Sequence, residues 1–233
     1  MASAEQPILQ RWTHRSEGTA RSVIIPDECR DLIHWSVPGK RPWWTLSHLQ
    51  DGVVVADIPR GAVLVGYRLA PGAQLPQRVF DDLERCPADD PDRTIVRVID
   101  EVRCNPRVVE ALAAVAELSQ TVETAAADLG VSRRTLERVL LLHTGRAPVF
   151  WSQLARVRAA ARLLVAGMRL ADAALETGYS DQAHMTRAVG RWFGVRPTDL
   201  PRHQNLAAQL SSPGYDAATG EQISTRYPSG SLT

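Results

Sequence analysis

One helical motif occurs twice in the C-terminal half of this 233-residue sequence, and no other feature restricts the possible folds as strongly. The stretch AAADLGVSRRTLERVLLLHTGRAP returns in outline as AALETGYSDQAHMTRAVGRWFGVRP. The matched positions are Gly130 and Gly178, Ser132 and Ser180, Arg138 and Arg187, Gly145 and Gly194, and Pro148 and Pro197. The first glycines are 48 residues apart and the arginines 49, so the second copy has one extra residue between them. Such a repeat predicts two copies of one helix-turn-helix unit.

The first copy has the local signals of two short helices joined by a tight turn. An alanine-rich helix over Val122–Leu129 should end at Gly130, because glycine adopts the left-handed conformation of a helix C-terminus at no steric cost. Ser132 can then accept backbone N–H bonds as the N-cap of a second helix that begins at Arg133. The second copy should repeat this arrangement.

The second helix of each copy has a polar outer face. In the first copy Leu136, Val139 and Leu140 share the apolar face, which leaves Arg133, Arg134, Glu137 and Arg138 outside. In the second copy the outward residues are Asp181, Gln182, His184 and Arg187. The dipole of an exposed helix N-terminus favours anions, and a recognition helix enters the DNA major groove with this end.

These outward side chains include the types that read base edges, since Arg pairs with guanine and Gln with adenine. For Arg138 and Arg187, which occupy matching places, base contact is favoured over a phosphate contact or a solvated surface position. For Glu137, Asp181 and His184 both interpretations stay open.

A continuous helix should connect the two copies. Its apolar residues recur at spacings of four and three, namely Phe150, Leu154, Val157, Ala161 and Leu164. Arg156, Arg158 and Arg162 lie off this stripe, and the first two are candidates for phosphate contacts. About 17 residues at 1.5 Å rise make a rod of roughly 25 Å, on which one chain could present two helices to successive major grooves about 34 Å apart.

Charge is distributed unevenly along the chain, although the net charge is only +1. Residues 121–202 contain 12 arginines against 7 acidic residues, whereas residues 1–120 contain 14 basic and 17 acidic residues. The concentration of basic charge on the repeat favours a nucleic-acid partner for that part of the chain.

The first third alternates short β-prone runs with turn residues, and Gln50-Asp51-Gly52 between two of the runs is a hairpin signal. The expected fold class is α+β: a small, mainly antiparallel β domain followed by an all-α, homeodomain-like double helix-turn-helix domain. The expected boundaries are a β domain at 1–75, a helical connector at 76–104, the double helix-turn-helix at 105–204 and a flexible tail at 205–233. The tail is rich in Ser, Gly, Thr and Pro.

From about Pro106 to Arg202 the sequence resembles the AraC/XylS family of bacterial transcription regulators. The resemblance rests on the doubled helix-turn-helix, the linker segment RVRAAARLL and the stretch GYSDQAHMTRAVGRWFGVRP. That stretch is similar to the family pattern Gly-aromatic-Ser, His-hydrophobic-x-Arg and Phe-Gly-x-x-Pro. It departs from many members by lacking aromatic residues in Met185–Val189, so a smaller core is expected there. The resemblance implies that Arg133, Arg134, Glu137 and Arg138 hold base-reading positions of the first unit, and Gln182, His184 and Arg187 those of the second.

A family member of this kind would be a sequence-specific regulator that binds double-stranded DNA and contacts RNA polymerase. A small-molecule effector, a homodimer, activation and repression all stay open. The alternative is a protein-interaction module whose β domain binds a partner while DNA binding is secondary. A footprint without sequence preference would favour that alternative.

Several other classes are not expected. The three cysteines are scattered, which fits a reducing cytoplasm better than a disulfide framework or a zinc site. The chain has neither a signal peptide nor the apolar run of about 20 residues that spans a bilayer. Without a nucleophile triad, P-loop or dinucleotide signature, no catalytic residue, cofactor or metal ligand is assigned, and enzymatic activity is not expected.

The β domain offers candidates for an effector site, although 75 residues are few for the cupin-type effector barrel of many AraC/XylS members. Residues that could line such a site are Arg30, Asp31, His34, Trp43, Trp44, His48 and Tyr67. An ordinary small β core with a polar rim explains the same residues.

Overall fold

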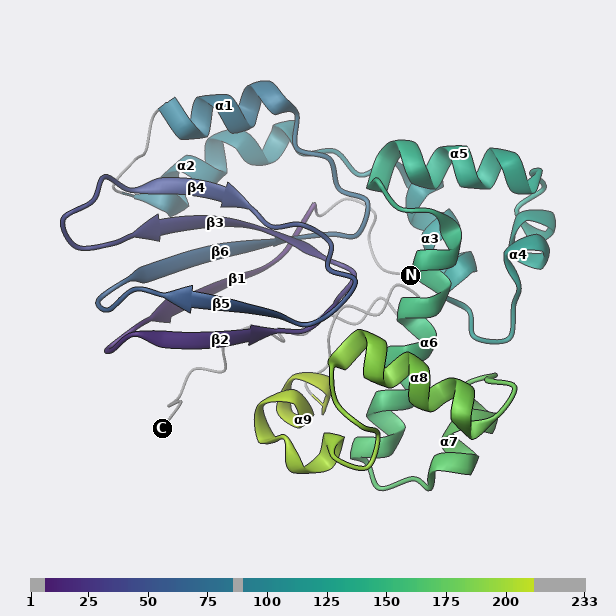
Figure 1. Ribbon diagram of the computed structural model, residues 1–233. Helices are drawn as coiled ribbons and strands as arrows, with labels where there is room; N and C mark the ends of the chain where they lie inside the picture. The colour runs from purple at the N-terminus through teal and green to yellow at the C-terminus, as the bar shows by residue number, and fades with distance from the viewer. Residues whose placement is uncertain (1–6, 86–89, 212–233) are drawn as a thin grey trace.

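The computed structural model describes residues 7–85 and 90–211, and it consists of a β part and a helical part that lie side by side (Figure 1). The strands are β1 (Ile8–Arg15), β2 (Ala20–Ile24), β3 (Arg30–Ser36), β4 (Trp43–Leu46), β5 (Val54–Ile58) and β6 (Val63–Leu69). The helices are α1 (Gln77–Arg85), α2 (Pro91–Val98), α3 (Pro106–Ala116), α4 (Val122–Asp128), α5 (Arg133–Thr144), α6 (Pro148–Val165), α7 (Leu170–Glu176), α8 (Gln182–Phe193) and α9 (Gln204–Ser211). The predicted α+β class, with antiparallel sheets before a helical region, is confirmed.

The strands form two antiparallel sheets, one with the order β1-β6-β3-β4 and one in which β2 pairs with β5. The expected hairpin at Asp51-Gly52 is wrong, because β4 pairs with β3 whereas β5 pairs with β2 in the other sheet. Residues 47–53, which we call the crossing segment, instead reach the helical half. There Leu49 is buried, and its carbonyl oxygen accepts a hydrogen bond from Arg146 Nη2 at 2.7 Å.

Helices α1 and α2 cover one face of the four-stranded sheet (Figure 1). Leu83 of α1 and Ile95 of α2 are buried in one apolar cluster with Leu32, Trp44 and Tyr67 of the sheet. The region predicted as a connector is therefore helical, but these helices are a layer of the β domain because their apolar faces need the sheet for burial.

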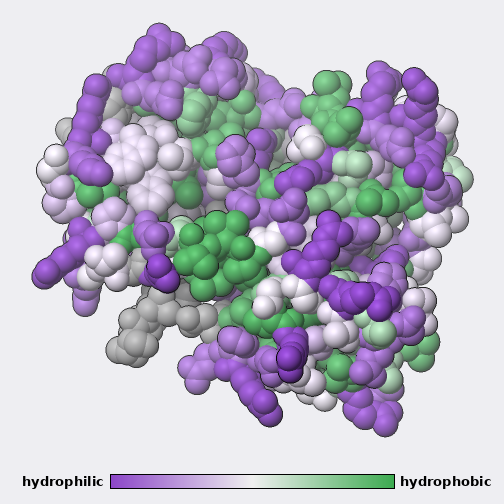
Figure 2. Space-filling view, in the orientation of Figure 1, coloured by the Kyte–Doolittle hydropathy of each residue, from purple (hydrophilic) through white to green (hydrophobic). Residues whose placement is uncertain are grey.

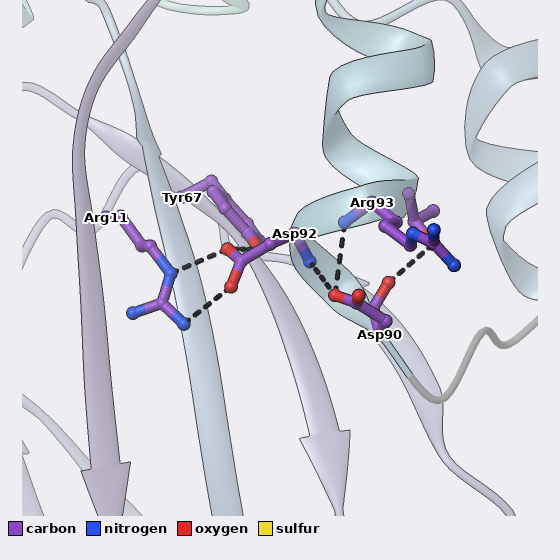
Figure 3. Close-up of polar contacts among 6 residues, drawn as sticks. Arg11, Tyr67, Asp90, Asp92 and Arg93 are labelled. Atoms are coloured by element: carbon purple, nitrogen blue, oxygen red, sulfur yellow. Dashed lines mark hydrogen bonds and ion pairs between the residues drawn. The ribbon is translucent and has the colours of Figure 1, made fainter.

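Asp92, at the start of α2, ties this helix to two strands (Figure 3). Its carboxylate accepts hydrogen bonds from Arg11 Nε and Nη2 of β1, at 2.6 and 2.9 Å, and from the Tyr67 hydroxyl of β6, at 2.6 Å. The bonds from Arg11 and Tyr67 lower the pKa of Asp92. Asp90 caps the helix by accepting from the backbone N–H groups of Asp92 and Arg93.

Helix α6 runs past two apolar cores, one for each helix-turn-helix unit (Figure 1). We call α4 and α5 unit one, and α7 and α8 unit two. Near the start of α6, Trp151 is buried with residues of α3, α4 and α5. The second half of α6 is buried with residues of α7, α8 and α9. The predicted apolar stripe is confirmed, with Leu154, Val157, Ala161 and Leu164 buried and Phe150 half-buried.

The chain continues as a helix beyond residue 204, where a flexible tail was expected. In α9, Leu206 and Leu210 are buried in the core of unit two. The expectation is therefore wrong for residues 205–211, because two leucines four residues apart supply an apolar face that packs on α6. The rest of the predicted tail, 212–233, lies outside the described residues.

Candidate nucleic-acid interface

The turn of each unit is built from backbone hydrogen bonds that require a positive φ at its glycine. Gly130 has φ 66°, and its N–H donates to Ala127 O at 2.9 Å while Val131 N–H donates to Ala126 O at 3.0 Å. Gly178, with φ 70°, ends α7 with the same pair of bonds. This arrangement stops a helix with one residue in the left-handed region, which disfavours residues with a β-carbon.

The second helices of the two units, α5 and α8, are capped by different residues. Ser132 Oγ accepts from Thr135 N–H at 3.1 Å, and α5 begins directly afterwards, as predicted. In unit two the cap is Asp181, whose Oδ1 accepts from His184 N–H at 2.6 Å. Ser180, the counterpart of Ser132 in the repeat, lies one residue before the cap. Asp181 is thus a structural cap, which corrects its assignment as an outward residue of the helix.

The caps also explain the extra residue of the second copy. Counted from the N-cap, Arg138 is the sixth residue of α5 and Arg187 the sixth of α8. Both helices have 12 residues and end at a glycine in the left-handed region, Gly145 and Gly194. The extra residue therefore lies in the turn, and α5 and α8 are equivalent position by position. Arg133 corresponds to Gln182, which a match of the glycines alone would have missed.

Two predicted reading residues of α5 bind each other. Arg133 Nε lies 2.9 Å from Glu137 Oε1, and the same guanidinium also pairs with Glu123 of α4. The bond to Glu137 and the charge of Glu123 raise the pKa of Arg133. Glu123 is a partner of Arg133 that the sequence did not reveal, because the contact joins two helices. Arg134 and Arg138 are exposed, and within residues 7–85 and 90–211 they form no ion pair.

The predicted reading residues of α8, Gln182, His184 and Arg187, are all exposed. His184 is also held against the turn, since its Nδ1 lies 3.2 Å from Ser180 Oγ and its ring meets the Tyr179 ring edge-on at 5.1 Å. Figure 2 shows hydrophilic side chains gathered over the upper right of the molecule, where α5 and α4 lie. The exposed positions of Gln182, His184 and Arg187 suit contact with a polar, charged ligand.

The two linker arginines proposed as phosphate contacts have different surroundings. Arg158 is 3% exposed, and its Nη1 donates to Pro26 O of the β domain at 2.8 Å, so the prediction of a phosphate contact is wrong for this residue. Burial lowers its pKa. The periodicity of α6 could not reveal that the β domain covers this side of the helix. Arg156 is half-buried, with its guanidinium 5.8 Å from the centre of the Tyr179 ring beside unit two.

The candidate effector residues of the β domain do not come together in one place. His34, Trp44 and Tyr67 contribute to the face under α1 and α2, whereas Trp43 packs on the opposite face. Several of them already have partners within the fold. Arg30 Nη2 donates to Ala73 O at 2.7 Å, and Asp31 Oδ1 accepts from Trp12 Nε1 at 3.1 Å. These contacts support the β-core interpretation of the same residues.

The two caps should respond differently to pH. We expect Ser132→Ala to cost about 1 kcal/mol of folding stability at any pH, because a hydroxyl cap does not titrate. The bond from His184 N–H lowers the pKa of Asp181, so its cap is intact above the ordinary Asp pKa of about 3.9 and is lost as the pH falls through the lowered value. Asp181→Ala should therefore destabilise at pH 7 and approach wild type in acid. Urea unfolding of both variants from pH 7 to pH 3 measures this, and equal pH profiles would contradict it.

Part of the helical half matches a known protein family. Residues 125–203 match the protein family described as "Helix-turn-helix domain", and no curated protein matches the sequence. Solved structures that are similar include the C-terminal domain of AraT, a response regulator from Geobacillus stearothermophilus (26% identity, 43% of this chain and 87% of that chain, TM-score 0.40). An AraC-type regulator from Chromobacterium violaceum has 25% identity over 47% of this chain and 96% of that chain, with a TM-score of 0.39. ToxT from Vibrio cholerae has 8% identity over 83% and 96%, with a TM-score of 0.44.

In the described ranges 7–85 and 90–211, no helix combines the length and the apolar character needed to cross a membrane. The family match covers α5, α6, α7 and α8. Residues 125–203 form a helix-turn-helix domain of the AraC type, the DNA-binding domain of transcription regulators.

Proposed function

We propose that the chain is a sequence-specific regulator in which units one and two read two successive segments of the major groove. The observation that carries this proposal is the equivalence of Arg138 and Arg187, each exposed at the sixth position after its N-cap. Two independent surface arginines would have no reason to share this place in both copies. A long polar side chain in the second turn of a reading helix can reach a base edge.

Each reading residue has a proposed role. Arg138 and Arg187 bind guanine through O6 and N7, and Gln182 binds adenine. Glu137 can accept from cytosine N4, in which case Arg133 turns from Glu137 to a phosphate. The proposed DNA-binding residues are Arg133, Arg134, Glu137 and Arg138 in unit one and Gln182, His184 and Arg187 in unit two. Arg156, beside unit two, is the proposed phosphate contact of the linker helix.

The biological setting follows from a DNA partner. A regulator bound at a promoter acts on transcription through RNA polymerase, which is therefore a proposed partner. Because chromosomal DNA lies in the bacterial cytoplasm, we propose that the protein acts there. The proposed role is binding, with no catalytic step. Selection of bound sites from random DNA tests it directly, and a bound pool without any sequence preference would favour the alternative protein-interaction module.

The proposed readers and the proposed phosphate contact should behave differently when removed. Arg138→Ala or Arg187→Ala should cost about 1–3 kcal/mol on the selected site and relax base preference at one position, because a bidentate contact to guanine is lost. Arg156→Ala should weaken all sequences alike and reduce the slope of log affinity against log salt by about one. Titrations by fluorescence anisotropy at several salt concentrations measure both effects.

Arg169→Ala is a matched control for these variants. Arg169 precedes α7, and its side chain is 85% exposed and paired with Asp172 rather than placed on a reading helix. Its removal should leave base preference unchanged. A uniform loss across all sequences for Arg138→Ala and Arg187→Ala would mean that these residues bind phosphates and that the assignment of readers is incorrect.

A further inference from the structure

The β domain contributes a buried side chain to the core of each helix-turn-helix unit. Leu49 of the crossing segment is 9% exposed and belongs to the cluster formed by α3, α4, α5 and the start of α6. Ile25, which follows β2, is 1% exposed and belongs to the cluster formed by the rest of α6 with α7, α8 and α9. The same domain is therefore anchored in both units at once.

The crossing segment itself touches both units. Arg146, between α5 and α6, donates to Leu49 O at 2.7 Å and lies over the Phe150 ring at 4.7 Å from its centre. Three residues later, Gly52 lies beside α8, since a β-carbon at this position would be 3.7 Å from the carbonyl oxygen of Arg191. The next residue, Val53, packs against the core of unit two. Residues 49–53 thus lie across the junction of the units, alongside α6.

A third contact lies between these two anchors, on α6. Arg158 is buried and donates to Pro26 O at 2.8 Å, next to Ile25. The charges of Asp27 and Glu28 act on the same guanidinium and favour its charged form. Near the C-terminal end of the helical half, Gln209 Nε2 of α9 donates to Val23 O of β2 at 3.1 Å. These bonds join the β domain to the linker helix, to the turn before it and to α9, and none involves a proposed base reader.

We propose that Ile25, Leu49 and Arg158 are positioning residues that set the spacing and relative rotation of the two DNA half-sites. This inference rests on the proposed function, in which both units read DNA. A single helix joining two small units fixes their separation, but side contacts are needed to hold their mutual rotation, because precise geometry depends on packing around the elements that carry a site. The β domain supplies those contacts at both ends of α6 and in its middle.

Spacing preference in the full-length protein tests this inference. The DNA panel carries the two selected half-sites with the spacer changed by −2, −1, 0, +1, +2 and +5 base pairs, together with a single half-site. For wild type, +5 rotates one half-site by about half a turn, so affinity should fall about tenfold or more, toward the value for a single half-site. For Leu49→Ala with Ile25→Ala, and separately for Arg158→Met, changes of one or two base pairs should alter affinity less than about threefold. The ratio between spacers cancels any loss in the fraction of folded protein.

Leu83→Ala is the matched control, because it removes an equally large side chain that is buried between α1 and the sheet, away from the helical half. It should keep the wild-type spacing profile. Circular dichroism checks folding, and Leu49→Val replaces the double variant if that does not fold. Variants that keep the wild-type profile would overturn the inference and leave two-unit reading intact. Wild type that binds every spacer equally would instead overturn the proposed function.

Discussion

Ala160→Pro should reduce the affinity of the protein for its two-part site to that of a single half-site. Ala160 is fully buried in the second half of α6, where this helix packs in the core of unit two. Proline removes the hydrogen bond from this residue to the preceding turn and its ring clashes with the carbonyl there, which kinks a helix at a cost of about 3 kcal/mol or more. Because each unit packs on its own part of α6, a kink would rotate one reading helix against the other.

Ala160→Gly is the control at the same position. It keeps the backbone hydrogen bond and should cost only about 1 kcal/mol, so the two-part site should still be bound specifically. Circular dichroism and binding to a single half-site show whether the proline variant is folded, since collapse would imitate a loss of docking. If folded Ala160→Pro bound the two-part site at full strength, the units would act independently, and α6 would not be the element that couples them.

Arg68→Met should be among the most destabilising single changes in the β domain, at about 3–5 kcal/mol. Arg68 on β6 and Asp27 after β2 form an ion pair of 2.6 Å with side chains only 2% and 3% exposed. Removing one partner leaves the other charge buried in a medium that solvates it poorly, which costs more than the pair itself contributes. Asp27 also accepts from Cys29 N–H at 3.1 Å, so the loss should loosen the segment that carries Ile25. Urea unfolding measures the change.

Arg21→Met is the matched control for the buried pair. Arg21 pairs with Asp57 across β2 and β5 at 3.2 Å, but these side chains are 79% and 73% exposed, so we expect a loss of only about 0–1 kcal/mol. Asp27→Asn combined with Arg68→Met should recover part of the stability lost in Arg68→Met, because the carboxylate that Arg68 neutralises is then removed as well. Equal losses for Arg68→Met and Arg21→Met would contradict this account of the buried pair.

The parts of the structure that could be predicted from the sequence are those set by neighbours within one or two helical turns. The left-handed glycine at 130, the cap at Ser132 and the start of α5 at Arg133 depend on hydrogen bonds that span three to five residues. The apolar stripe of α6 depends on a period of 3.6 residues. The repeat adds a second copy of the same local chemistry, so two helix-turn-helix units and their polar faces could be predicted without knowledge of the fold.

The turn of unit two shows where even local signals leave a choice. Ser180 and Asp181 are adjacent and both are good N-caps. Sequence matching selects Ser180 as the counterpart of Ser132, but Asp181 caps α8. Met185 and Val189, both fully buried, are the fourth and eighth residues of α8, the places that Leu136 and Leu140 hold in α5. Tertiary burial of the apolar face thus decides the register, and with it the equivalence of Arg138 and Arg187.

The sequence by itself determined two helix-turn-helix units on a shared helix, because turns, caps and amphipathic periods are short-range and each is repeated. Only the tertiary structure decided where Asp51-Gly52, Arg158 and residues 205–211 lie. Asp51-Gly52 lies in the segment that crosses to the helical half instead of forming a hairpin. Arg158 is buried against Pro26, and residues 205–211 belong to a helix that packs in the core of unit two. In each case the partner lies far away along the chain, and burial of apolar surface or satisfaction of a buried polar group outweighed the local preference.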